Sequence, residues 1–140
     1  MTWKNKEIKF RAWIPDKKEM IKVDALVLSE NVFRDYRVPH ILDEHNDIYD
    51  LNGVFLMQYT GCKDRDGKEI YEGDVLQVLD DFLGIVRFKD GCHYLVLLNG
   101  DNDYASCLCL RNYNVSPIKI VGNIFENPEI VEQYSPKKQT

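Results

Sequence analysis

Short apolar segments separated by turns that contain glycine and aspartate make up most of the chain from residue 54 onward. Several of them follow one another at intervals of about 8–12 residues, a spacing typical of all-β domains. The segments comprise residues 54–59, 75–79, 84–88, 93–98, 107–110 and 118–124. Such a series predicts a small antiparallel barrel or sandwich.

The N-terminal residues carry a second strand signal. Residues 8–13 alternate between two sets of side chains, namely Ile8, Phe10 and Ala12 against Lys9, Arg11 and Trp13. A period of two is typical of a half-buried strand. Residues 15–18 then supply a turn, and residues 20–28 are predicted to return as another strand. The expected barrel therefore has added N-terminal strands.

Two other segments lack the strand pattern. Residues 29–50 show no sustained period, and we interpret them as a long irregular insertion with residues 43–47 at its exposed tip. Residues 127–129, Asn-Pro-Glu, favour one helical turn, because Asn can cap it and Pro suits its first position. We predict a single domain over residues 1–133, with little helix and a disordered tail at 134–140.

Charge is unevenly distributed along the chain. Residues 1–22 hold seven basic and three acidic side chains, a net charge of +4, whereas the whole chain carries −5, which leaves −9 elsewhere. This balance argues against a protein that binds nucleic acid by general electrostatic attraction. A basic hairpin at residues 1–22 can contact an acidic partner, although lysines that merely solvate two strands are the simpler interpretation.

Three segments resemble a known family. Residues 8–13 (IKFRAW), 56–74 (LMQYTGCKDRDGKEIYEGD) and 121–129 (VGNIFENPE) are similar, in the same order, to blocks of the YopX-like proteins of phages and prophages. The resemblance implies a fold related to SH3-type β-barrels and a gene in a phage or prophage. It implies no activity and no catalytic or binding residues. Cys62 departs from the leucine usual in the family, and residues 29–50 resemble no family segment.

The residues of these blocks are expected to shape the backbone. Gly61 ends a strand, Gly67 supplies positive φ in a turn, and the Gly73-Asp74 pair permits a bend whose carboxylate binds loop amides. We favour this interpretation over a catalytic Asp74. The predicted structural motif comprises Gly61, Gly67, Tyr71, Gly73, Asp74, Gly122 and Asn123.

Neither calcium nor zinc is expected. The Asp64–Gly67 segment resembles the start of a calcium loop, but Cys62 and Gly73 then stand where oxygen ligands are required. For zinc, Cys107 and Cys109 form the only close cysteine pair and have the wrong spacing, even if Cys62, Cys92 and His93 approached them. Cys62 is more simply a small apolar side chain. We expect no metal and no cofactor.

No catalytic constellation is recognisable in the sequence. There is no G-x-S-x-G motif and no glycine-rich phosphate loop. Cys92 and His93 are adjacent, so on a strand they point to opposite faces and cannot pair. Six aromatic residues can form either a ligand groove or the core, and core is the default: Trp3, Trp13, Tyr59, Tyr71, Phe88 and Tyr94.

These observations favour a non-enzymatic interaction module. No apolar run approaches the roughly 18 residues of a membrane-spanning helix, and no signal peptide is recognisable, so we expect no membrane contact and a cytoplasmic protein with reduced thiols. We predict self-association through residues 1–22 by edge pairing of strand 8–13, with Lys9, Arg11 and Trp13 at the interface, and binding to a phage or host protein. The alternative is a nucleic-acid-associated phage factor that uses the basic hairpin.

Overall fold

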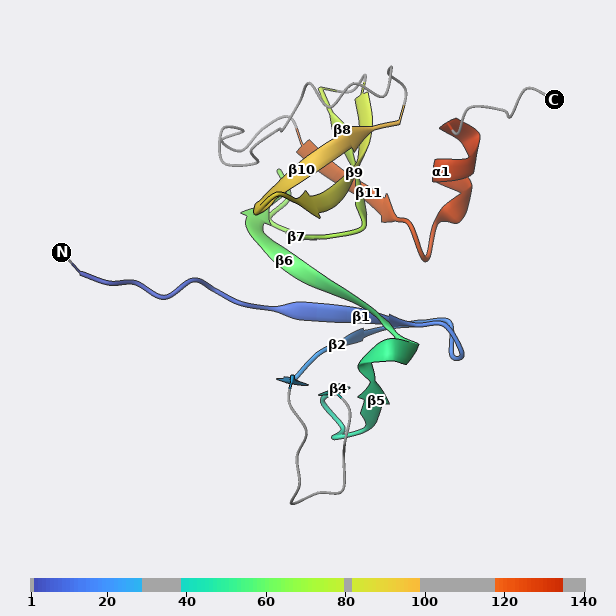
Figure 1. Cartoon of the computed structure of the whole chain (residues 1–140). Helices are drawn as coiled ribbons and strands as arrows, with labels where there is room; N and C mark the ends of the chain where they lie inside the picture. The colour runs from blue at the N-terminus through green and yellow to red at the C-terminus, as the bar shows by residue number, and fades with distance from the viewer. Residues whose placement is uncertain (1, 29–38, 80–81, 99–117, 135–140) are drawn as a thin grey trace. The chain divides into compact units, whose positions relative to one another are not determined.

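A computed structural model describes residues 2–28, 39–79, 82–98 and 118–134. The chain divides into two compact units, Met1–Tyr59 (unit 1) and Thr60–Thr140 (unit 2). The described residues contain eleven strands, one 3-10 helix and one α-helix (Figure 1). Every strand pair for which a register is given is antiparallel. The prediction of a mainly β, antiparallel fold is confirmed.

Strand β1 (Phe10–Ile14) is the central strand of unit 1. It pairs with β2 (Glu19–Lys22) on one edge and with β6 (Phe55–Lys63) on the other. The turn that follows β1 closes with a hydrogen bond from Lys17 N to Ile14 O. Ala12 and Ile14 point into the core, where they meet Ile21 and Ile41. The alternation in the sequence therefore identifies this strand, but β1 begins at Phe10, and Ile8, which was expected on its apolar side, is 66% exposed.

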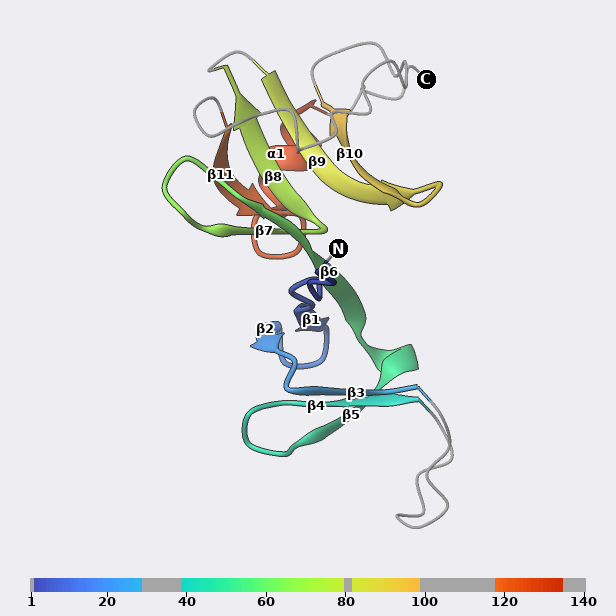
Figure 2. The same ribbon diagram turned by 90° about the vertical axis from the view of Figure 1, so that its left-hand side faces the viewer.

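A second sheet of unit 1 consists of β3 (Ala25–Val27), β4 (His40–Leu42) and β5 (Ile48–Asp50), which lie side by side in Figure 2. A 3-10 helix, η2 (Leu51–Gly53), follows, and the Asp50 side chain accepts from Asn52 N at its start. The prediction that residues 29–50 are irregular is wrong for residues 40–50, which form a regular hairpin. Residues 29–38 lie outside the described part.

Strand β6 belongs to both units, because the boundary between Tyr59 and Thr60 falls within it. Its first residues pair with β1, and β7 (Glu69–Tyr71) is its neighbour on the other side in the sheet order β2-β1-β6-β7. The match between the predicted and observed strand is incomplete. We expected the strand to end at Gly61, but β6 continues to Lys63 and Gly61 adopts a φ of +85° within it.

The main sheet of unit 2 has the order β10-β9-β8-β11. Its strands are β8 (Asp74–Val78), β9 (Phe82–Lys89), β10 (Cys92–Leu97) and β11 (Ile118–Asn123), and Figure 2 shows them as one curved layer. The buried core on one face comprises Ile70, Leu76, Val78, Val86, Leu95 and Ile118. The predicted turn between residues 88 and 93 is the two-residue turn between β9 and β10, in which Asp90 and Gly91 both have positive φ.

The C-terminal helix is short. The predicted helical turn is confirmed as α1 (Pro128–Tyr134), which begins with Pro128 and has Glu129 in its first turn. Neither this helix nor η2, among the described residues, is long and apolar enough to cross a membrane. The predicted strand at 107–110 and residues 135–140 of the predicted tail lie outside the described residues, and the predicted tail began one residue too early, because Tyr134 is the last residue of α1.

Candidate functional site

We call the turns centred on Asp64, Asp74 and Asn123 the three block motifs. Asp64 is the centre of the first one. Its carboxylate is buried and accepts three backbone hydrogen bonds, from Asp66 N and Lys68 N at 2.9 Å each and from Ile120 N at 3.1 Å. Burial by itself raises the pKa of Asp64, but the backbone donors Ile120, Lys68 and Asp66 lower it, and the net pKa lies below its ordinary value of 3.8. Asp64 therefore fixes the β6–β7 hairpin and ties it to β11.

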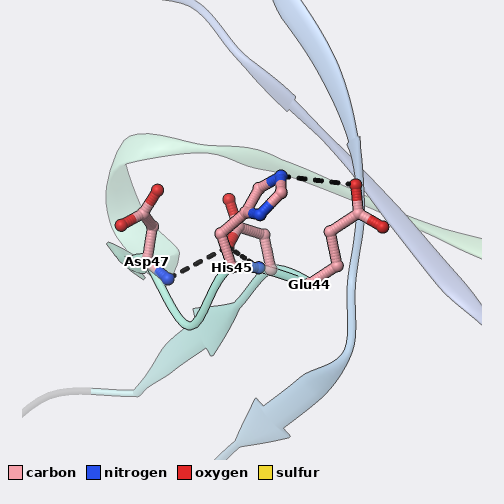
Figure 3. A network of polar contacts seen from close by, with 4 residues as sticks. Glu44, His45 and Asp47 are labelled. Atoms are coloured by element: carbon pink, nitrogen blue, oxygen red, sulfur yellow. Dashed lines mark hydrogen bonds and ion pairs between the residues drawn. The ribbon is translucent and has the colours of Figure 1, made fainter.

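The loop at 43–47 repeats this arrangement in unit 1 (Figure 3). Asp43 is buried, and its Oδ1 accepts from His45 N at 2.9 Å and from Asp47 N at 3.0 Å. Burial raises its pKa, yet the backbone donors Asp47 and His45 bring the net pKa below 3.8. The loop was predicted to be an exposed tip. Glu44 and His45 are indeed exposed, with Glu44 Oε1 3.5 Å from His45 Nε2, but Asp43 anchors the loop from inside.

The second block motif is the bend at Tyr71–Asp74. Asp74 is only 1% exposed, and its Oδ2 accepts from Tyr71 N at 2.8 Å. Gly73 has a φ of +84°, donates to Val86 O and accepts from Ile124 N. A side chain at position 73 would be strained in this conformation. The carboxylate of Asp74 thus holds a turn, as expected for a residue that serves the backbone.

The third block motif centres on Asn123. Its Oδ1 accepts from Phe125 N at 3.1 Å and from Glu126 N at 2.8 Å, and its Nδ2 donates to Glu126 Oε1. Asn127 was expected to cap α1, but its Oδ1 accepts from Asn123 N, on the side away from the helix. A Cβ at Gly122 would lie 2.6 Å from Asn127 Oδ1, so the glycine makes room for this contact.

A different kind of site lies on β1. Lys9, Arg11 and Trp13 alternate with the core residues of this strand and therefore share the opposite face. Trp13 stands directly opposite Met20 on β2 and Phe55 on β6. These three side chains form one apolar row across three strands, and Phe55 is 52% exposed.

A row with two cations runs beside the apolar row. Arg11 stands opposite Lys22 on β2 and Met57 on β6. Further along, Lys9 Nζ lies 2.7 Å from Glu7 Oε1 and 5.6 Å from the ring centroid of Tyr59. We define the outward face as Lys9, Arg11, Trp13, Met20, Lys22 and Phe55. It contains the three predicted interface residues and three that the sequence analysis missed.

The predicted route to self-association is closed. Both edges of β1 are already paired, one with β2 and the other with β6, so this strand has no free edge to offer to a second copy. The face of β1 that carries Arg11 and Trp13 is exposed at Phe55 and Lys22, but Met57 beside Arg11 is only 4% exposed and Arg11 Nε is buried. The prediction of edge pairing by residues 8–13 is therefore wrong, whereas self-association by another route stays a prediction.

The thiols and histidines that the structure describes do not form one cluster. Within the described residues, no group of three or more His, Cys, Asp and Glu side chains could hold a metal ion, and Cys107 and Cys109 lie outside them. Cys62 packs against the core of unit 2, as expected for a small apolar side chain. Cys92 is a second free thiol, whose Sγ is 3.3 Å from His93 O.

His93 is a partly buried imidazole on β10. Its ring packs edge-on against Phe88 with 4.9 Å between ring centroids, and its Nε2 has neither solvent contact nor a hydrogen-bond partner in the described structure. Burial lowers the pKa of His93 below 6.5, and the Glu72 carboxylate opposes that shift only in part.

The six aromatic residues do not all share the predicted core position. Tyr59 and Tyr71 are buried, at 4% and 8% exposure, so the prediction is correct for them. It is wrong for Trp3 and Phe88, which are 86% and 52% exposed. Trp13 and Tyr94 are half-buried. The aromatic residues therefore divide between core and surface.

The geometry defines a class: an antiparallel β protein whose block motifs fasten turns and whose central N-terminal strand presents a mixed apolar and basic face. The YopX protein family model matches residues 9–132, across both units, and the chain belongs to this family. The crystal structure of protein EF1440 from Enterococcus faecalis has a similar fold, with a TM-score of 0.63 and 24% sequence identity over 91% of this chain and 99% of that chain. No curated protein matches the chain.

Proposed function

We propose that this protein is a non-enzymatic accessory protein of a phage or prophage, that it acts in the cytoplasm, and that it works as a β-sheet interaction module. Its contact surface is the outward face of β1, β2 and β6. Whichever partner binds there covers the apolar row and meets the neighbouring cations.

The polar residues of the block motifs hold backbone turns, and this role supports a binding function over a catalytic one. Asp64, Asp74 and Asn123 are the polar residues that stand out in the sequence, and each accepts backbone hydrogen bonds. A carboxylate engaged in this way holds a loop and is poorly placed to transfer a proton to a substrate. These motifs account for folding and leave the contact role to another surface.

The observation that carries the proposal is the row Met20–Trp13–Phe55. The register places these side chains directly opposite one another, and Phe55, the first residue of β6, is 52% exposed. Large apolar side chains that gather on an exposed face, with charged residues at the border, are typical of protein contact sites. Trp and Arg are also the residues most often dominant in such contacts.

The basic residues weigh against nucleic acid as the partner. Lys6 precedes β1 and Lys18 follows it, so the basic residues of the hairpin are distributed along a strand about 17 Å long. Lys9 already lies 2.7 Å from the Glu7 carboxylate, and Lys17 Nζ donates to the Tyr49 hydroxyl. Binding to phosphates needs several free cations on one surface.

Site-specific photo-crosslinking tests the proposal. Benzoylphenylalanine replaces Phe55 in one variant of the full chain and Phe88 in another, since both phenylalanines are 52% exposed and lie on strands. The variants are expressed in the cells that naturally carry the gene and are then irradiated. Position 55 is expected to give a discrete protein adduct, and position 88 is not.

The adduct must also depend on the rest of the outward face. Adding Lys22→Glu to the variant at position 55 should abolish the adduct while the protein remains folded, because Lys22 is exposed. Equal crosslinking at positions 55 and 88, or no adduct at position 55, would contradict the proposed contact surface.

A further inference from the structure

We propose that strand β10 pairs edge to edge with β10 of a second copy of this chain, antiparallel and about a two-fold axis. The contact lies on unit 2 and does not depend on the outward face of unit 1. It is indicated by which strand edges of the described structure are closed, which are protected and which are neither.

The main sheet of unit 2 has one closed end. Its two end strands are β10 and β11 (Figure 2). The edge of β11 is occupied by the loop 64–68, since Ile118 O accepts from Arg65 N at 2.9 Å. Ile120 N donates to Asp64 Oδ2 at 3.1 Å on the same edge. Among the strands that the structure describes, only β9 pairs with β10. A second copy can therefore extend this sheet at β10 but not at β11.

The open edge of β10 presents alternate backbone groups. Residues that flank a two-residue turn form a hydrogen-bonded pair, so the backbone groups of Lys89 and Cys92 point toward each other. The bond from Leu98 N to Leu83 O, at 2.8 Å, has the same phase. Every second residue of β10 therefore bonds to β9. The residues between them direct their N–H and C=O groups away from β9, namely His93, Leu95 and Leu97.

β10 lacks the features that usually keep an exposed edge from pairing. Natural edge strands are very short or carry charged residues or Pro. In this chain β3, β5 and β7 have three residues each, and β2 carries Glu19 and Lys22. β10 has six residues, Cys-His-Tyr-Leu-Val-Leu, and contains no Lys, Arg, Asp, Glu or Pro. Of the end strands without a described partner on their outer edge, β10 is thus the one suited to pairing.

A second copy matches this edge in length and in chemistry. A two-fold axis at Leu95 sets Leu95 opposite itself and His93 opposite Leu97 of the copy, so every outward N–H and C=O finds a partner. It also sets Tyr94 opposite Val96 of the copy, and an aromatic side chain beside a β-branched one stabilises antiparallel strands. No Lys, Arg, Asp or Glu of β10 meets its like across the axis. Because the sheet is closed at β11, the pairing joins two copies and stops there.

Light scattering on the purified full chain measures the assembly. The native protein is expected to reach the mass of a dimer as its concentration is raised. Val96→Lys is expected to keep the mass of one chain, because a lysine on an edge strand opposes pairing. Val121→Lys is the matched control, since Val121 is an exposed valine of β11 at the closed end, and this variant should still form the dimer. Melting curves establish that each variant is folded.

Hydrogen exchange followed residue by residue tests the register. In a single chain the amides of Tyr94 and Val96 are protected by their bonds to β9, whereas those of His93, Leu95 and Leu97 exchange rapidly. In the native dimer both sets should be protected, and dilution should remove the protection of the second set alone. This measurement uses the native protein, so it decides the matter even if Val96→Lys fails to fold.

Four results would overturn the inference. The first is a native protein that is monomeric at every concentration, and the second is a folded Val96→Lys variant that still forms the dimer. The third is a dimer whose Leu95 and Leu97 amides exchange rapidly, because its copies then meet elsewhere. The fourth is a monomer in which these amides are protected, because one chain then covers its own edge. None of these results bears on the outward face. Phe88 remains a valid reference for crosslinking, because it lies on β9 and contacts His93 from that side.

Discussion

Asp43 and Asp64 hold two hairpin loops of different sequence with the same set of hydrogen bonds. Each carboxylate accepts from the backbone two and four residues further on, at 2.9 and 3.0 Å for Asp43 and at 2.9 Å twice for Asp64. Each loop is also closed by a backbone bond from its first residue to its fifth. The fourth residue has positive φ in both loops, 62° at Asn46 and 81° at Gly67. The loops 43–47 and 64–68 are therefore one structural device used twice.

The first prediction concerns this fourth position. Asn and Gly are the residues that accept positive φ at least cost, so Gly67→Asn and Asn46→Gly should each change the free energy of unfolding by less than about 1 kcal/mol. Gly67→Val should destabilise by more than about 1 kcal/mol, because a β-branched residue is strained there although open space surrounds it. Urea denaturation measures all three. A Gly67→Val variant as stable as Gly67→Asn would show that φ does not limit the loop.

The second prediction concerns the Asp64 carboxylate. Asp64→Ala leaves three backbone donors without their acceptor and should lower the free energy of unfolding by about 1–3 kcal/mol. Asp66→Ala is the matched control, since Asp66 is exposed in the same loop and contributes only its backbone NH. Urea denaturation at neutral pH compares the two variants. Equal losses would contradict the role given to Asp64.

The third prediction is the acid response of the same group. The pKa of Asp64 in the folded state lies below its ordinary value of 3.8, so its carboxylate stabilises the fold above that pH. This contribution should disappear as the pH falls from 3.8 through the lower folded-state pKa. Acid titration followed by far-UV circular dichroism should therefore be less steep for Asp64→Asn than for the native protein. If the acid unfolding curves of Asp64→Asn and the native protein were equally steep, Asp64 would have the same pKa in the folded and unfolded states.

The fourth prediction concerns His93. Burial lowers its pKa in the folded state, whereas the unfolded chain takes up a proton near the ordinary value of 6.5. Stability from this group is therefore complete above pH 6.5 and should decline as the pH falls through 6.5 towards the folded-state pKa. His93→Gln should lose this component of the thermal midpoint's pH dependence. His45→Gln is the control, because His45 is 74% exposed, and an equal effect of both variants would contradict the prediction.

The fifth prediction concerns zinc and covers all four cysteines. If they are structural thiols, the purified full chain should contain far less zinc than protein, and a chelator should leave the thermal midpoint unchanged. Metal analysis by mass spectrometry and a melting curve with chelator decide this. Stoichiometric zinc whose removal unfolds the protein would overturn the prediction.

Local signals in the sequence predicted the local structure well. The Asp-Gly pair at 90–91 marked a hairpin turn, and the alternation at 8–13 marked β1, because both patterns depend only on neighbouring residues. The hairpin at 40–50 was not predicted from the sequence, because its loop has Asn46 at the position where the equivalent loop has Gly67. The signal was nevertheless present, as Asp at the first position and Asn or Gly at the fourth occur in both loops.

Long-range pairing explains the remaining errors. Trp13 was identified from its own strand, but its neighbour Phe55 lies 42 positions away, and no local pattern reveals that register. For the same reason β1 was expected to have a free edge. Which strands become neighbours depends on how the whole sheet assembles, so the apolar row could be recognised only in the structure.

The position of the unit boundary inside β6 has a consequence for how such a protein can arise. Domains that are exchanged between genes are usually joined by a linker, and a break in the linker leaves both intact. Here a break anywhere in residues 55–63 would interrupt the strand to which both β1 and β7 are joined. Neither unit could be transferred to another gene by a break at this boundary without damage to its sheet. Recombination among genes of this family should therefore preserve the segment from β1 to β7 as one block.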